Sequence, residues 1–384
     1  MPRPKTIYFD CNATTPLDAQ VREAMLPFLG GVFGNPSSIH HVGREARSIL
    51  DDARDRVAQI WGSKPSEVVF TSGGTESNNL AIFGTARLLR DKGRHLITSR
   101  IEHHAVLHCF EYLEKKEGFS VTYLSVDEEG LVSPEDLARA IRPETILVSI
   151  MSANNEVGTV QPVDALGEVC RSRGVIFHTD AVQWLGKEHF KSIHQFNADL
   201  VSVCSHKFYG PKGAGALFVR SPLHPDPILF GGGHENERRA GTENMAGIIG
   251  FTEALSRFVR VPVFSSEALK PLTARLTACI GSMDGVAFRG SPRQRLANTV
   301  AFTVAGCDSI TLLAGLDLLG ICASSGSACS AGSLKPSHVL LALGVEKRLA
   351  NSLVRFSLGR DSTLQEVESA ADGFLHVIKQ ARCL

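Results

Sequence analysis

The chain reads Ala198-Asp-Leu-Val-Ser-Val-Cys204 and then, without a break, Ser205-His-Lys-Phe-Tyr-Gly-Pro211. The first half is mostly apolar and β-branched, which is typical of a buried strand. The second half places Lys207 at the end of that strand, directly before a glycine- and proline-rich turn. A lysine held so tightly is desolvated, and desolvation lowers its pKa and frees the amine for Schiff-base chemistry. The alternative, from these residues alone, is a lysine that merely ends a strand.

Strand-like and helix-like segments alternate on both sides of this stretch. We expect strands at 67–71, 95–98, 145–150, 174–178, 200–203 and 215–219, and helices at 75–89, 105–116 and 163–172. Such alternation predicts an α/β fold in which helices cover both faces of a parallel or mixed sheet. Ligands of such sheets gather at the carboxyl ends of the strands.

The length of 384 residues predicts two domains, because a single small core cannot accommodate it. A proline-containing break at 261–265 follows a helical stretch at 242–259. We expect an N-terminal extended segment at 1–15, a large domain with a mainly parallel sheet at 16–261, and a smaller α+β domain at 262–384.

The charge balance excludes some partners. There are 40 basic and 40 acidic residues, so no basic field exists to attract nucleic acid or an anionic membrane. The N-terminus lacks the apolar run of a signal peptide. The apolar stretch at 310–323 contains Asp317 and is too short to span a bilayer. We expect a soluble, cytoplasmic protein that binds neither nucleic acid nor membrane.

Nine cysteines are scattered along the chain without a C-x-x-C pair. This pattern argues against a disulfide framework and against a structural zinc site, and it fits a reducing compartment. The neighbouring His103 and His104 point to opposite sides of the chain and have no carboxylate or cysteine at ligand spacing. We therefore expect no metal.

A glycine pair follows the strand expected at 67–71, in the run Phe70-Thr-Ser-Gly-Gly-Thr-Glu-Ser-Asn78. A turn from a strand into a helix through two glycines leaves backbone N–H groups and the positive helix end free to bind an anion. Gly74 and Thr75 are therefore candidate phosphate ligands, unless the glycines only shape the turn.

Acidic and aromatic side chains follow two other expected strands. Asp180, after 174–178, could keep a pyridine nitrogen protonated, and Gln183 is close enough in sequence to reach a ring hydroxyl. The other role open to Asp180 is that of a helix N-cap. His103, after 95–98, could stack on a flat ring and move protons. A lysine, an acid, a flat ring and an anion site together match the needs of pyridoxal phosphate (PLP).

An arginine and a cysteine complete the candidate set. Arg355 lies in an apolar strand-like run, where its planar guanidinium matches an α-carboxylate; a structural salt bridge is the alternative. Asn155 ends another strand and offers an amide to the same crevice. Cys329 stands in Ala323-Ser-Ser-Gly-Ser-Ala-Cys-Ser-Ala-Gly-Ser333. Residues so small cannot build a core, which favours a thiol that acts as a nucleophile.

Together these stretches resemble the cysteine desulfurases, PLP enzymes of the class V aminotransferase group. The resemblance runs essentially from end to end and is carried by Asn12-Ala-Thr-Thr-Pro16, Gly34-Asn-Pro-Ser-Ser38, Gly73-Gly-Thr-Glu-Ser77, Glu102-His103, Asn154-Asn-Glu156, Asp180 with Gln183, Ser205-His-Lys207, Gly231-Gly-Gly-His234, Arg239-Ala-Gly-Thr-Glu-Asn244, Ser324-Ser-Gly-Ser-Ala-Cys329 and Arg355-Phe-Ser-Leu-Gly359. The cysteine loop is similar to that of the first subgroup, which includes the nitrogen-fixation and iron–sulfur types.

The resemblance implies a PLP-dependent aminotransferase type I fold and a homodimer. It implies that Lys207 holds PLP covalently and acts in catalysis with Cys329 and His103. Further cofactor contacts would come from Gly74, Thr75, His103, Asn155, Asp180, Gln183, either Cys204 or Ser205, His206, and Thr242 of the partner subunit. Arg355 and Asn155 would bind the substrate carboxylate.

The expected reaction converts L-cysteine to L-alanine and leaves a persulfide on Cys329, which supplies a sulfur acceptor or an iron–sulfur scaffold protein. Two alternatives stay open. One is another PLP enzyme on the same fold, such as an aminotransferase or a selenocysteine lyase, although an aminotransferase has no use for Cys329. The other is a non-catalytic binding protein, which would not need the complete catalytic set.

Overall fold

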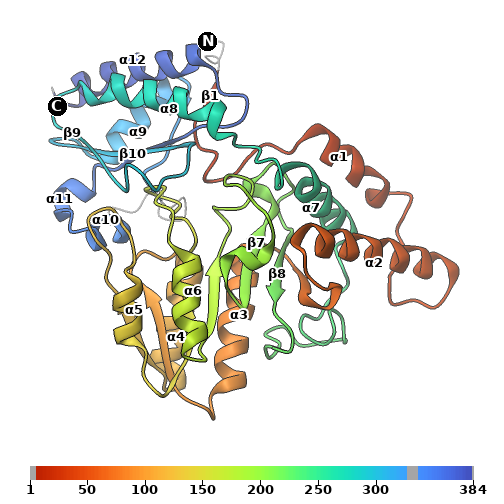
Figure 1. The fold of residues 1–384 in the computed structure, drawn as a ribbon. Coiled ribbons are helices and arrows are strands. Elements are labelled where there is room, and N and C mark those ends of the chain that lie inside the picture. The colour runs from red at the N-terminus through yellow and green to blue at the C-terminus, as the bar shows by residue number, and fades with distance from the viewer. Residues whose placement is uncertain (1–5, 327–335, 383–384) are drawn as a thin grey trace.

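A seven-stranded sheet forms the centre of the larger part of the molecule (Figure 1). The computed structural model describes residues 6–326 and 336–382. The sheet has the strand order β2-β8-β7-β6-β5-β3-β4. Its strands are β2 (Val68–Thr71), β3 (His95–Ser99), β4 (Ser120–Leu124), β5 (Thr145–Ser149), β6 (Ile176–Asp180), β7 (Leu200–Cys204) and β8 (Gly215–Val219).

Strand direction brings the functional ends of the strands together. The neighbours β7, β6, β5, β3 and β4 are parallel, whereas β8 runs antiparallel to both β2 and β7. Every residue of β3, β5, β7 and β8 is buried, as expected for apolar strands that are covered on both faces. The carboxyl ends of the parallel strands therefore meet at one edge of the sheet.

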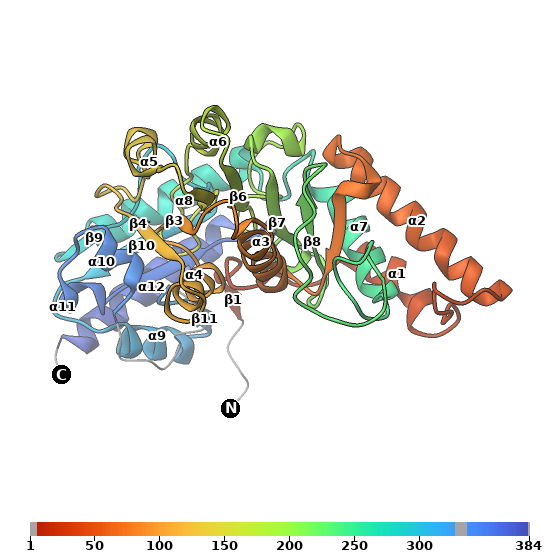
Figure 2. The same ribbon diagram turned by 90° about the horizontal axis from the view of Figure 1, so that it is seen from below.

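Helices cover both faces of this sheet. Figure 2 shows α3 (Gly74–Leu89) and α4 (His104–Glu117) on one face, and α5 (Pro134–Ala140) and α6 (Val163–Ser172) on the other. In α6 the buried residues recur every three to four positions, the spacing of a helix that packs one apolar stripe inward. Beside the β2–β8 end, α7 (Met245–Phe258) packs against α1 (Ala19–Met25) and α2 (His41–Trp61).

A second sheet forms the smaller domain, with three antiparallel strands in the order β12-β10-β9. Its elements are α8 (Ser266–Gly281), β9 (Val286–Phe288), β10 (Thr299–Val304), α9 (Ser309–Leu318), β11 (Ile321–Cys322), α10 (His338–Ala342), α11 (Lys347–Ala350), β12 (Val354–Ser357) and α12 (Leu364–Ala381). Phenylalanines link its sheet to α12: the ring centroids of Phe302 and Phe374 are 5.0 Å apart.

The N-terminal segment connects the two sheets. Strand β1 (Ile7–Tyr8) pairs with β11 of the smaller domain. The backbone N–H of Asn12 then donates to Ser357 Oγ (3.0 Å), and that of Thr15 donates to the carbonyl oxygen of His206 in the larger domain (2.9 Å). The first residues of the chain thus bind both domains.

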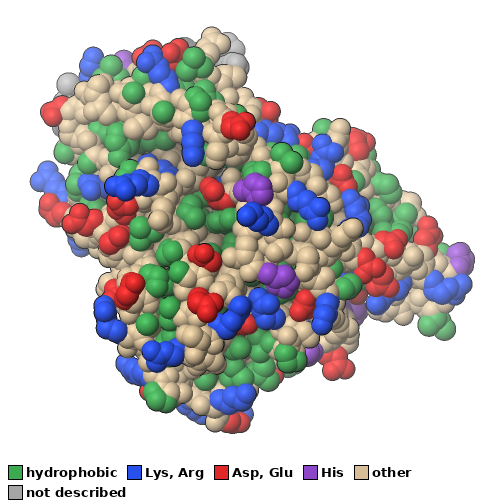
Figure 3. Space-filling view, in the orientation of Figure 1, with side chains coloured by type: hydrophobic (Ala, Val, Ile, Leu, Met, Phe, Trp, Pro, Cys, Tyr) green, Lys and Arg blue, Asp and Glu red, His purple; other side chains and the backbone are tan. Residues whose placement is uncertain are grey.

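Charged side chains of both signs are interspersed on the face shown in Figure 3, in line with the equal numbers of basic and acidic residues in the sequence. Within the described ranges, none of the helices combines the length and the apolar character that crossing a bilayer requires.

The predicted fold class is confirmed: the molecule has a large, mainly parallel sheet and a smaller α+β domain, the type I arrangement of PLP enzymes. The predicted domain limits at 16–261 and 262–384 stay a prediction. Helix α7 ends at Phe258 and α8 begins at Ser266, one on each side of the limit.

Candidate active site

A cavity of about 260 Å³ lies at the carboxyl ends of β6 and β7, beside the first turn of α3. The residues predicted from the sequence that line it are Gly74, Thr75, His103, Asn155, Asp180, Gln183, Cys204, His206, Lys207 and Arg355. It is also lined by residues to which the sequence analysis gave no role in the site, which are Asn12, Ala13, Asn78, Met151, Ala153, Val182 and Gly326. Both domains therefore contribute to one chemical site.

Lys207 reaches into this cavity from the turn that follows β7. Its Nζ donates to the main-chain carbonyl oxygens of Asn12 and Ala13, at 2.7 Å from each. Burial lowers the pKa of Lys207, and the adjacent Cys204 acts in the opposite direction. A lowered pKa favours the neutral amine, which is the form that attacks a carbonyl carbon.

Asp180 is the last residue of β6, and both of its carboxylate oxygens are bonded. Asn78 Nδ2 donates to Oδ2 at 2.7 Å, and the backbone N–H of Val182 donates to Oδ1 at 2.9 Å. Asn78 lies on α3, so the helix and the strand together fix the direction of the carboxylate. The sequence alone did not indicate this partner.

His103 is the N-cap of α4, and its ring lies at the cavity wall. The backbone N–H of Ala105 donates to His103 Nδ1 at 3.1 Å, so the neutral ring carries its proton on Nε2. Burial lowers the pKa of His103, and the nearby Asp180 opposes this effect. The site therefore offers a flat ring with a single N–H donor at its free nitrogen.

The start of α3 provides an anion site. Its N-cap is Gly73, whose backbone has φ +148° and which has no side chain to occupy the N–H groups of the first turn. A Cβ at Gly74 would lie 2.6 Å from Val182 Cγ2, so glycine suits this close approach of α3 to the turn after β6. Thr75 follows in the cavity wall and adds a hydroxyl.

Of the two candidate contacts at the end of β7, only Cys204 lines the cavity. The hydroxyl of Ser205 is directed elsewhere: its oxygen lies 2.5 Å from the carbonyl oxygen of Pro211 and 3.0 Å from that of Ala214. Burial raises the pKa of Cys204 to about 11, so its thiol keeps its proton. The structure thus brings Cys204 and His206, but not Ser205, to the wall of the cavity.

Arg355 extends from β12 of the smaller domain and is fully buried. Its Nη2 forms an ion pair with Asp10 Oδ1 (2.6 Å), and its Nη1 donates to the carbonyl oxygens of Asn155 and Gly326, at 2.7 Å from each. The salt bridge considered as an alternative from the sequence is therefore present. The guanidinium nevertheless also lines the cavity.

Two further predicted residues are not among the described residues that line the cavity. Thr242 is exposed and does not line the cavity of its own subunit. Cys329 lies outside the described residues. The described chain before it ends at Gly326, in the cavity wall. After it, His338 Nε2 lies 2.9 Å from the carbonyl oxygen of Glu102. Gly326, three residues before Cys329, therefore lies at the cavity.

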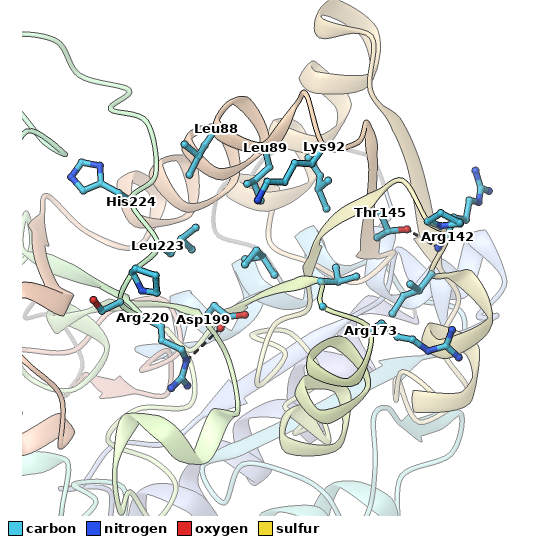
Figure 4. A pocket seen from close by; sticks show the side chains of 18 residues that line it. Leu88, Leu89, Lys92, Arg142, Thr145, Arg173, Asp199, Arg220, Leu223 and His224 are labelled. Carbon is cyan, nitrogen blue, oxygen red and sulfur yellow. Dashed lines mark hydrogen bonds and ion pairs between the residues drawn. The ribbon is translucent and has the colours of Figure 1, made fainter.

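A second hollow, of about 840 Å³, lies at the amino ends of β5, β6 and β7 (Figure 4). Leu88 and Leu223 supply apolar surface there, and Arg220 Nε lies 3.4 Å from Asp199 Oδ1. The residues predicted to carry chemistry line the smaller cavity instead. Size alone is therefore a poor guide to the active site of this chain.

A family model described as "Aminotransferase class-V" matches residues 7–369. The chain belongs to the class-V aminotransferase family. This finding confirms the predicted resemblance.

Relatives are similar over nearly the whole chain. The cysteine desulfurase IscS of Dictyoglomus turgidum is 45% identical over 382 residues, covering 99% of this chain and 96% of that protein. The cysteine desulfurase IscS of Methanosarcina thermophila is 45% identical over 378 residues, covering 98% of this chain and 93% of that protein.

Solved structures are similar as well. A NifS-like protein has a TM-score of 0.91 at 35% identity and covers 98% of this chain and 100% of its own. SspA in complex with cysteine has a TM-score of 0.82 at 37% identity and covers 93% of this chain and 100% of its own.

Enzymes of this family depend on PLP, and the cavity fits that group. Lys207 provides the amine for a covalent link, and Asp180 provides a fixed carboxylate for a pyridine nitrogen. His103 offers a flat ring, and the first turn of α3 at Gly74 offers an anion site. These donors surround one cavity, as a cofactor with a ring and a phosphate requires.

Asn78→Ala should weaken PLP binding, because Asp180 would lose the hydrogen bond that orients its carboxylate. A hydrogen bond to a charged group contributes about 1.5–3 kcal/mol, so we expect the Kd for PLP to rise about tenfold or more. Fluorescence titration of the apoenzyme measures it. Asn79→Ala is the matched control, since Asn79 donates to Thr75 of its own helix. An unchanged Kd for Asn78→Ala would show that Asp180 does not depend on Asn78.

Proposed function

We propose that this chain is a cysteine desulfurase that converts L-cysteine to L-alanine and places the sulfur on Cys329 as a persulfide. The observation that carries this proposal is the arrangement of an amine, a carboxylate, an imidazole and a guanidinium around one cavity. The wall of that cavity includes Gly326, shortly before the proposed nucleophile. Relatives described as cysteine desulfurases, at 45% identity, support it.

Lys207 is the proposed base of the reaction. When bound, PLP withdraws electrons from the substrate α-carbon. The carbonyl oxygens of Asn12 and Ala13 hold Lys207 Nζ in place, and burial favours its neutral form. The amine can therefore accept the α-proton of the substrate and return it later.

Asp180 and His103 complete the ring site. The carboxylate of Asp180, fixed by Asn78, would keep a proton on the pyridine nitrogen. His103 would stack on the ring and, as a neutral imidazole, can exchange a proton with the substrate sulfur through Nε2. Gln183 would contact the ring oxygen.

Cys329 is the proposed nucleophile. Its thiolate attacks the sulfur of the substrate, an S–S bond forms and the C–S bond breaks. The β-carbon of the substrate takes up a proton, and alanine leaves. Cysteine and one thiol thus give alanine and one persulfide. The outer sulfur of the persulfide is then transferred to a sulfur acceptor, for which we propose an iron–sulfur scaffold protein.

Cys329→Ser should bind PLP normally but release almost no alanine from L-cysteine, because no thiol is present to take the sulfur. Alanine and sulfide production with a thiol reductant, measured beside transamination with a keto acid, tests this. Cys322→Ser is the control, since Cys322 lies in β11 and should leave most activity intact. Turnover of cysteine by Cys329→Ser near the wild-type rate would instead favour an aminotransferase or another lyase.

Arg355 and Asn155 are the proposed ligands of the substrate carboxylate. The Asp10 ion pair holds the guanidinium of Arg355 in a fixed plane at the cavity wall. A planar fork binds a carboxylate in two-point fashion, which the point charge of a lysine does not reproduce.

Arg355→Lys should therefore raise KM for cysteine about tenfold or more while leaving the spectrum of bound PLP intact. Steady-state kinetics and an absorption spectrum measure the two effects. Arg360→Lys is the control, because Arg360 pairs with Asp18 and lies outside the cavity lining. An unchanged KM would leave Arg355 with only its structural salt bridge.

We further propose that the enzyme is a homodimer in which Thr242 of the partner subunit contacts the cofactor phosphate. Large apolar side chains are exposed near the relevant segments: Phe33 is 79%, Ile39 90% and Phe230 84% exposed. Ser37 Oγ lies 3.4 Å from His234 Nε2, so the two segments adjoin. Covering this surface with a second copy would remove apolar area from water.

The backbone before Thr242 is strained in a way that supports this assembly. Glu235, Asn236 and Glu237 have φ values of +51°, +54° and +63°, which is the left-handed region. The buried Glu235 is held by Arg54 at 2.5 Å. Strain of this kind persists only where the surrounding structure enforces it, and it concentrates at functional sites.

Phe230→Glu should yield a monomer with reduced PLP occupancy, because each site would lose the contribution of its partner. Light scattering reports the mass, and absorbance of the same sample reports bound PLP. Leu318→Glu is the control, since Leu318 is 83% exposed but lies on α9. A monomer with full PLP occupancy would contradict the shared site.

The state of the cysteines indicates the redox character of the cell compartment in which the protein works. Those in the described residues are free thiols. Unpaired thiols suit a reducing compartment, for which we propose the cytoplasm.

A further inference from the structure

Lys187 is a fully buried lysine to which the proposed reaction gives no role. Only 2% of its surface is exposed. The preceding Gly186 has φ +79°, and a Cβ there would lie 2.6 Å from Phe208 Cβ. The chain therefore turns tightly before Lys187. Burial of an amine is costly unless its N–H groups find partners.

The partners of this amine are the oxygens of two side-chain amides. Lys187 Nζ donates to Asn12 Oδ1 and to Gln183 Oε1, at 2.6 Å from each. It also lies 5.2 Å from the centroid of the Phe264 ring. Both amide side chains belong to residues that line the cavity.

Other titratable groups face Lys187 from several elements. Burial lowers its pKa well below the usual value, and the charges of Lys207 and Arg355 lower it further. Cys11 and Cys204 raise the pKa of Lys187.

The amine of Lys187 has an N–H for each of these two amide oxygens in either protonation state, three as an ammonium and two as a neutral amine. Its N–H therefore favours the orientation in which the Gln183 oxygen faces Lys187 and the NH₂ group faces the other way. One N–H of that group donates to the carbonyl oxygen of Asn12 at 2.8 Å. The second N–H remains for a ligand in the cavity that Gln183 lines.

Lys187 orients the Asn12 amide by the same rule. Asn12 Oδ1 faces Lys187, so Asn12 Nδ2 turns to the smaller domain and donates to Thr299 Oγ1 at 2.9 Å. The carbonyl oxygen of the same residue receives the hydrogen bond from Lys207 Nζ. Lys187 thus contacts Gln183 directly and is connected to Lys207 through Asn12.

We propose that Lys187 is a positioning residue for the cofactor: it holds the Gln183 amide so that an N–H, and not the carbonyl oxygen, faces the ring oxygen of PLP. This inference rests on the proposed placement of Gln183 at that ring oxygen. Without Lys187 only the hydrogen bond to the carbonyl oxygen of Asn12 holds the amide. A turned amide would place its carbonyl oxygen against a negative ring oxygen.

The expected consequence is a change in the titration of the bound cofactor. An N–H donated to an anionic oxygen stabilises the anion and lowers the pH at which the proton is lost. Loss of that donor raises the midpoint pH. For one hydrogen bond to a charged oxygen we expect a rise of about one pH unit.

Lys187→Met tests this in the holoenzyme, because methionine has a similar length but no donor. The midpoint pH of the visible absorbance change of bound PLP should rise by about one unit. Borohydride reduction followed by peptide mapping should still place the cofactor on Lys207. Lys191→Met is the control, since Lys191 is exposed on the same segment and should leave the midpoint unchanged. An unchanged midpoint in Lys187→Met would overturn the proposal.

A double-mutant cycle separates positioning from a general structural effect. In a Gln183→Met background, Lys187→Met should shift the midpoint no further, because the amide through which it acts is gone. Equal shifts in both backgrounds would overturn the role of Gln183 as the intermediary.

Lys187→Gln serves if the methionine variant does not fold. Its shorter side chain should raise the midpoint in the same direction by a smaller amount, and no rise would count against the proposal. The titration needs bound PLP but no turnover of cysteine. A wild-type enzyme that binds PLP yet fails to release alanine would therefore refute the proposed reaction while this test still decides the role of Lys187.

Discussion

The carbonyl oxygen of Asn12 is where the two domains and the cavity meet. It accepts hydrogen bonds from Lys207 Nζ at 2.7 Å and from Gln183 Nε2 at 2.8 Å. A carbonyl oxygen has two lone pairs, so one peptide group orients two side chains of the larger domain. The same segment pairs with β11 and donates to Ser357 of the smaller domain. A displacement of the N-terminal segment would therefore disturb the domain contact and the site together.

Much of the site was predictable because its residues stand at the ends of strands. Asp180 ends β6, and Lys207 follows β7. Parallel strands bring such ends to one edge regardless of the details of packing. The apolar, β-branched runs that indicated those strands are buried in the structure. Less distinct elements escaped notice: β4 is only partly buried, and α5 buries a single residue, Leu137.

What the sequence could not reveal depends on side-chain directions set by tertiary packing. Asn78 lies on a helix, and no local pattern indicates that its amide reaches Asp180 across the sheet edge. Lys187 looks like an ordinary charged residue after a glycine, yet it is buried between two amides. The neighbours Cys204 and Ser205 could not be ranked from sequence, because their roles depend on which one faces the cavity.

The contacts of Arg355 affect more than the binding of a carboxylate. Its Nη1 holds the carbonyl oxygen of Gly326, the last described residue before the segment that bears Cys329. A single guanidinium thus lines the proposed substrate subsite and holds Gly326, three residues before the proposed nucleophile Cys329. Two events that share one group are linked in free energy, and such linkage is reciprocal. The factor by which the Gly326 contact changes the affinity for the carboxylate equals the factor by which a bound carboxylate changes the Gly326 contact.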